Sequence, residues 1–188
     1  MERRQEGSVA GQKKRRGRRS YLEDFKRTAS GEYIYKGPCH SYQEDGLSRQ
    51  KALAVLWLLT IAMAASVVAG GCMPAAGLMD CWYVILPWGF SLVAVVSVVW
   101  LMGRLTAGGD PLRDYVYRAT VLQSRLRGNL VFFLAAATLA GETVYLLGNG
   151  FGIRMKETMF FLFCMSALFV CTILWRLIMR RLHWSPEK

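Results

Sequence analysis

Residues 52–72 read ALAVLWLLTIAMAASVVAGGC and contain no charged side chain. A helix rises about 1.5 Å per residue, so roughly 20 apolar residues are needed to cross the hydrocarbon core of a bilayer. Three further stretches fit that length: residues 82–102, 129–148 and 158–175. All four runs are apolar on every face, whereas the strands of a membrane barrel alternate apolar and polar residues. The sequence therefore predicts an all-α integral membrane protein, an antiparallel bundle of four transmembrane helices.

The composition supports this class. The 188 residues are 53% hydrophobic and 20% charged, with a mean hydropathy of +0.23. The chain has 24 Lys and Arg against 13 Asp and Glu, a formal net charge of +11. A chain that is both apolar and strongly basic is not typical of a soluble or a disordered protein. It is typical of a protein whose apolar runs lie in lipid and whose basic residues face the cytoplasm.

Lys and Arg gather on one side of the predicted spans. The residues up to 51 carry 13 of them, the loop between the second and third spans carries five, and residues 176–188 carry four. The other two loops carry only the remaining two. Because basic loops stay on the cytoplasmic side, this distribution predicts that both termini are cytoplasmic. We expect a multi-pass protein of a cell membrane, with the bacterial inner membrane as the best fit.

The segments outside the spans are predicted to be a disordered tail (1–30), a juxtamembrane segment (31–51) and a basic C-terminal tail (176–188). In the juxtamembrane segment, Tyr33 and Tyr35 alternate about Ile34, a pattern typical of a short strand or an extended peptide. The first tail contains a basic cluster: Lys13, Lys14, Arg15, Arg16, Arg18 and Arg19. Each such residue near an anionic membrane surface contributes about 1 kcal/mol. No aromatic residues are interleaved with the cluster, so anionic headgroups are favoured over nucleic acid as its partner.

A helix is predicted over residues 111–127, between the second and third spans. Asp110 can cap it, and Pro111 suits its first position. Its apolar residues recur at helical spacing: Leu112, Tyr115, Ala119, Leu122 and Leu126. This pattern predicts an amphipathic cytoplasmic helix in the headgroup layer, in which Asp114 and Arg118 can pair. The alternative is a solvated extension of the third span.

Two cysteines flank the first short loop outside the cytoplasm. Cys72 and Cys81 are nine residues apart, and the loop between them contains Pro74 and Gly77. On an oxidising face they can close a disulfide. The alternative is a pair of free thiols.

The spans lack the residues that most intramembrane enzymes need. His40 and His183 lie in the tails, so neither a Ser/His protease nor a His-ligated metal site can form in the membrane. No Asp lies in a span, and no glycine-rich phosphate-binding motif is present. Cys39 and His40 are adjacent but too few to hold a metal ion. We therefore predict no enzymatic activity, no catalytic residues, no metal and no cofactor.

Glu142 is the one ionisable side chain within the predicted spans. A charge there costs about 2–3 kcal/mol on insertion scales, so Glu142 should face protein or water. Counting depth along each span predicts a polar site in which four residues lie at a comparable level: Ser66, Trp88, Ser91 and Cys164. The site is either a polar contact that fastens helices together, which we favour, or a proton or cation site.

Small residues recur at four-residue intervals in the first and third spans. They are Ala62, Ser66 and Gly70 in the first, and Ala137 and Gly141 in the third. Small residues at this spacing let helices approach closely in lipid. We therefore expect these two spans to pack against each other.

The leading functional hypothesis is a non-enzymatic membrane protein that works by association, as an accessory or scaffold subunit of a membrane complex. Its partners would be the bilayer and either further copies of itself or another membrane subunit. The alternative is a small oligomeric proton- or cation-coupled transporter that uses Glu142.

Overall fold

The computed structural model describes residues 25–27, 32–35, 37–43, 48–150 and 154–186. The chain divides into two units, Met1–Gly37 and Pro38–Lys188. In the first unit, β1 (Phe25–Arg27) and β2 (Tyr33–Tyr35) form an antiparallel pair. β2 coincides with the alternating tyrosines, whereas β1 lies within a tail for which no regular structure was predicted. The basic cluster of residues 13–19 lies outside the described residues.

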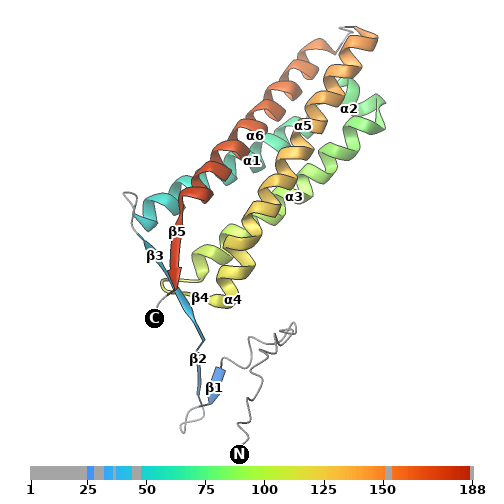
Figure 1. Cartoon of the computed structure of the whole chain (residues 1–188). Coiled ribbons are helices and arrows are strands. Elements are labelled where there is room, and N and C mark those ends of the chain that lie inside the picture. Colours follow the sequence, from blue (N-terminus) through green and yellow to red (C-terminus); the bar gives the residue numbers. More distant parts are fainter. Residues whose placement is uncertain (1–24, 28–31, 36, 44–47, 151–153, 187–188) are drawn as a thin grey trace, which may run out of the picture. The chain divides into compact units, whose positions relative to one another are not determined.

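Four long helices make up most of the second unit (Figure 1). They are α1 (Arg49–Gly71), α3 (Trp82–Ala107), α5 (Gln123–Asn149) and α6 (Met155–Arg181). Each is long and apolar enough to cross a membrane. They pack antiparallel, with α1 against α6 and α3 against α5. The predicted class, a small multi-pass membrane protein with four spanning helices, is confirmed at this level.

The helices are longer than the apolar runs that predicted them. α1 begins at Arg49, α3 continues to Ala107, and α6 ends at Arg181. Arg is a good helix former, and its long side chain can reach the polar layer from inside the helix end. α5 ends at Asn149, before Gly150 with φ of +72°. That left-handed conformation favours glycine and stops the helix there.

The neighbours of α1 differ from those expected from the small residues. α1 packs against α6 and α3, and α5 packs against α3 and α6, so α1 and α5 lie diagonally across the bundle. The prediction that the first and third spans pack together is therefore wrong. Gly70 of α1 instead faces Phe161 and Cys164 of α6, and Ala137 of α5 is exposed. Small residues allow a close approach, but they do not say which helix approaches.

The core of the bundle is apolar, and so is much of its surface. Trp175 and Phe161 are the largest fully buried side chains. The outward faces carry large apolar residues at high exposure: Leu58, Ile61, Val93, Phe133 and Phe163. Exposing so continuous an apolar surface to water is unfavourable, so these faces contact the hydrocarbon of a bilayer.

The segment 111–127 does not form a separate helix. Leu112 and Arg113 form the short strand β4, and α4 (Asp114–Tyr117) continues through a π-helix (Arg118–Leu122) into α5. A single helical rod therefore runs from Asp114 to Asn149, which corresponds to the alternative interpretation, an extension of the third span. The helix begins at Asp114 and not at Pro111 because Leu112 and Arg113 pair with another strand, and it continues without interruption through Gly128. Leu122 and Leu126 are exposed, while Thr120 and Ser124 face the bundle.

Two small elements lie at opposite ends of the bundle (Figure 1). A five-residue helix, α2 (Ala76–Asp80), lies between α1 and α3. At the other end, β3 (Cys39–Gln43) pairs with β4 (Leu112–Arg113) on one side and β5 (His183–Pro186) on the other, both antiparallel. The sheet therefore brings the segment before α1, the α3–α4 connection and the segment after α6 to one end, called here the sheet end.

Candidate functional site

Glu142 is completely buried where α5 passes α2. Its Oε1 accepts a hydrogen bond from the backbone N–H of Gly77, with N and O 3.2 Å apart. The other carboxyl oxygen, Oε2, is also buried and has no hydrogen-bond partner among the described residues. Glu142 is therefore buried, as the cost of a charge in the membrane predicted. Its partner, however, is a backbone group of the α1–α3 connection.

The contact with Gly77 caps a helix. The first N–H groups of any helix have no partner inside it, and residue 75, which precedes α2, is an alanine without a capping side chain. Two other helices supply the missing acceptors. Thr158 of α6 accepts from the N–H of Ala76 at 3.2 Å, and Glu142 of α5 accepts from the next N–H. A carboxyl group also suits the positive end of the helix dipole.

A third side-chain bond fastens the other end of α2. The hydroxyl of Tyr145, on α5, donates to Oδ2 of Asp80 at 3.0 Å. Gly77 leaves room for the contact with Glu142, because a Cβ atom at position 77 would displace the carboxyl group of Glu142. Glu142, Thr158 and Tyr145 thus hold α2 against the ends of α5 and α6, and we call this arrangement the α2 cap.

Two of the other residues of the predicted polar site have hydrogen-bond partners of their own. The indole Nε1 of Trp88 donates to the carbonyl of Val67, and the hydroxyl of Ser91 donates to the carbonyl of Pro87. Cys164 is buried on α6, and Ser66 is half-buried on α1. Within the described part of the chain, none of the four has a hydrogen bond to Glu142. The partner of Glu142 lies in a connection that folds back onto the spans, so the depth of residues within the spans does not indicate it.

Cys72 and Cys81 are not bonded to each other in the structure. Cys72 is exposed after the end of α1, and Cys81 is half-buried between α2 and α3. The disulfide stays a prediction.

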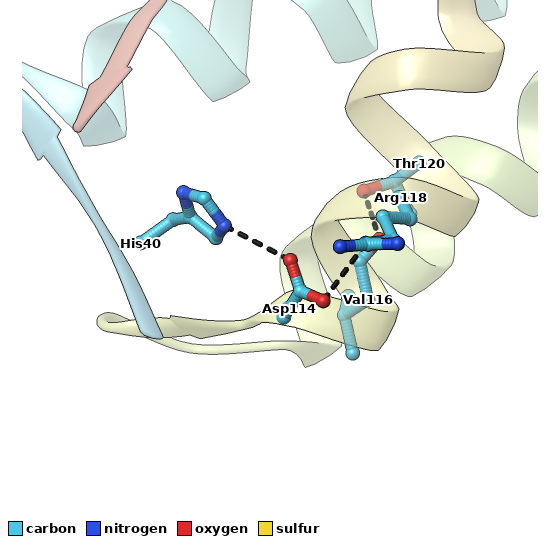
Figure 2. A network of polar contacts seen from close by, with 5 residues as sticks. All are labelled: His40, Asp114, Val116, Arg118 and Thr120. Atoms are coloured by element: carbon cyan, nitrogen blue, oxygen red, sulfur yellow. Dashed lines mark hydrogen bonds and ion pairs between the residues drawn. The ribbon is translucent and has the colours of Figure 1, made fainter. Parts of the chain in front are cut away.

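A second polar cluster lies at the sheet end (Figure 2). Asp114 begins the long rod, and its carboxylate has two partners. Nε2 of His40, from β3, lies 3.1 Å from Oδ1, and Nε of Arg118 lies 2.8 Å from Oδ2. The predicted pairing of Asp114 with Arg118 is therefore confirmed, and His40 adds a bond across 74 positions of sequence.

Backbone and ring contacts add to the same polar cluster. The N–H of Asp114 donates to the carbonyl of Pro38 at 3.0 Å. The ring of His40 stacks on Tyr117 with centroids 4.1 Å apart, and Trp184 of β5 meets Tyr117 edge-on. The cluster therefore ties three distant segments together. No sequence motif marked it, because its three segments are far apart: Asp114 lies 74 positions after His40 and 70 positions before Trp184.

Neither cluster has the composition of a metal centre. Over the ranges that the structure describes, no group of three or more His, Cys, Asp or Glu side chains is placed to hold a metal ion. Comparisons with protein families, with curated proteins and with solved structures find nothing that matches this chain. The four apolar helices define a small multi-pass membrane protein, and its two polar clusters connect elements of its own fold.

Proposed function

We propose that this chain is a non-enzymatic membrane protein that works by association, as an accessory or scaffold subunit of a membrane complex. The observation that carries the proposal is the α2 cap. The one carboxyl group within the predicted spans, that of Glu142, is buried and accepts a hydrogen bond from a backbone N–H of the protein itself. A carboxyl group used in this way stabilises the bundle and has no need of a transported ion.

The buried hydroxyl groups support the same role. A transport site gathers several polar side chains around its cargo. Here four of the five buried threonines among the described residues donate their hydroxyl to the carbonyl four residues earlier: Thr60 to Leu56, Thr120 to Val116, Thr138 to Leu134, and Thr172 to Leu168. Such bonds satisfy the hydroxyl locally, and the fifth threonine, Thr158, bonds to α2 instead.

The rival function is a small oligomeric transporter with Glu142 as its coupling carboxylate. The observation that favours it is the unpartnered Oε2 of Glu142, because a buried oxygen without a hydrogen bond is costly and often marks a functional group. Glu142→Gln separates the two functions. It keeps the acceptor for Gly77 but removes the titrating group.

We expect proteoliposomes containing the wild-type chain or Glu142→Gln to dissipate an imposed pH gradient equally slowly, as reported by an enclosed pH-sensitive dye. Glu157→Gln, which removes a carboxylate from the first turn of α6, is the matched control. Proton flux that exceeds that of empty liposomes, and that only Glu142→Gln abolishes, would establish the transporter instead.

Native mass spectrometry after extraction in mild detergent should show a complex heavier than one 21.2 kDa chain. A lone chain would contradict the scaffold function.

We also propose that the sheet end faces the cytoplasm, which places both termini there. The sheet supports this orientation because it joins the three segments that carry 22 of the 24 Lys and Arg residues. The basic cluster of residues 13–19 would then meet anionic headgroups, and the Cys72 and Cys81 loop would face the opposite, oxidising side. The bacterial inner membrane is the membrane that fits these assignments.

Cysteine labelling tests this orientation. In a background with all five native cysteines replaced by alanine, Gly17→Cys and Asn149→Cys serve as single reporters. A membrane-impermeant maleimide applied to intact cells should label only the reporter at 149, since a basic tail stays inside. After permeabilisation both reporters should react, which shows that each is accessible. Labelling at position 17 in intact cells would overturn the orientation.

A further inference from the structure

A pocket lies between the π-helix, α5 and α6 at the sheet end. Its volume is about 370 Å³, and three arginines line it: Arg125, Arg176 and Arg180. The rest of the lining is largely apolar and includes Leu122, Trp175 and Met179. A small apolar pocket with a few convergent polar groups is the usual form of a ligand site.

Among the described residues, the three arginines have no acidic partner. The two ion pairs at the sheet end belong to Asp114, and neither includes Arg125, Arg176 or Arg180. The guanidinium of Arg176 lies 4.9 Å from the ring centroid of Phe132, a contact that fixes its position without neutralising it. By contrast, neighbouring Arg127 donates to Ser97 and Gln123 of the protein. The pocket therefore concentrates positive charge that an anion can neutralise.

Trp175, another lining residue, carries a donor without a partner among the described residues. Its side chain is completely buried, and its Nε1 has no hydrogen-bond partner among the described residues. An unpaired buried N–H costs about 1–3 kcal/mol unless a ligand or water accepts from it. Gly128 allows this arrangement, because a Cβ atom there would lie 3.0 Å from Arg176 and 3.2 Å from Trp175.

The surface next to the pocket distinguishes a lipid from a free anion. Leu122 lines the pocket and begins a row of exposed apolar residues on one face of the rod: Leu126, Leu130 and Phe133. Their spacing of three or four residues keeps them on one side of the helix. An acyl chain can lie along this row while its headgroup stays among the arginines.

We propose that the pocket holds the phosphate headgroup of one anionic phospholipid. The arginine forks bind phosphate oxygens, which matches their planar and bidentate geometry. Basic pockets between membrane helices at the cytoplasmic surface bind anionic headgroups in the same way. This site is separate from the α2 cap, which lies at the other end of the bundle, so it does not depend on the role of Glu142.

Native mass spectrometry of the full chain in detergent tests the proposal, with phosphatidylglycerol and phosphatidylcholine of identical acyl chains as probes. The wild-type chain should retain phosphatidylglycerol about tenfold better, since phosphatidylcholine brings its own positive charge. Arg125→Gln/Arg180→Gln should abolish that preference. The control, Arg104→Gln/Arg181→Gln, removes the same charge from exposed positions at the sheet end outside the pocket and should keep it. Arg176 is left unchanged because it packs against Gly128 and Phe132.

A second variant leaves every arginine in place. Asn129 lines the pocket, and Asn129→Asp adds a negative charge with almost no change of shape. It should reduce retention of phosphatidylglycerol as strongly as the arginine double variant does. Equal retention of the two lipids by the wild-type chain, or equal losses in the pocket and control variants, would overturn the proposal. Release of the bound lipid by millimolar inorganic phosphate would also overturn it, because the ligand would then be the free anion.

Discussion

Replacing Glu142 with alanine is expected to lower the midpoint of thermal unfolding in detergent by roughly 10 °C. The substitution leaves the buried N–H of Gly77 without an acceptor, which costs about 1–3 kcal/mol. It also opens a cavity where a fully buried side chain lay, which adds a further cost of the order of 1 kcal/mol or more. For a chain of this size, each kcal/mol corresponds to about 2–4 °C.

Glutamine at position 142 should lower that midpoint by only about 3 °C, because its carbonyl oxygen can replace Oε1 as the acceptor. Thr143→Ala is the matched control, since Thr143 is exposed on the next position of α5 and bonds only within its own helix. It should leave the midpoint almost unchanged. A Glu142→Ala protein as stable as the wild type, or a Glu142→Gln protein as unstable as Glu142→Ala, would show that the cap bond does not stabilise the bundle.

The spanning helices could be predicted because one local property, the length of an apolar run, decides them. Their neighbours could not be. Leu56 is completely buried and Leu58 is 69% exposed, yet both are leucines of α1. In a soluble protein the exposed position would usually carry a polar residue, and the sequence would then distinguish it from the buried one. Lipid accepts an apolar side chain as readily as the protein interior does, so this distinction is lost. The diagonal placement of α1 and α5 therefore has no signature in hydropathy.

The candidate sites were predictable only in part, for a related reason. A carboxyl group in an apolar run must be buried, so the burial of Glu142 followed from its position alone. Its acceptor role depends on α2, a five-residue helix whose capping groups come from α5 and α6. The sheet also depends on distant contacts, because β4 has only two residues and is a strand through its pairing with β3. Such short elements are specified by distant contacts and leave little pattern in the local sequence.

Introducing leucine at Gly141 should disrupt the bundle near the α2 cap more than any exposed change on the same helix. A Cβ atom on Gly141 would lie 3.1 Å from the carbonyl oxygen of Tyr83 and 3.3 Å from Val84, both on α3. A backbone oxygen cannot rotate away as a side chain can, so α5 must move off α3, at a cost of about 1–3 kcal/mol or more. The displacement would also draw the adjacent Glu142 away from Gly77.

Gly148→Leu is the matched control for Gly141→Leu, since a Cβ atom at Gly148 meets nothing within 4 Å. Leu147→Ala, at a side chain that is 82% exposed, trims the same helix without touching α3. Both should stay within about 0.5 kcal/mol of the wild type in unfolding free energy. Gly141→Leu should unfold at least about 5 °C earlier in detergent and elute as a broadened species in size-exclusion chromatography. If Gly141→Leu matches Gly148→Leu in both measurements, α3 and α5 do not pack closely at Gly141, and the α2 cap loses the support that holds Glu142 in place.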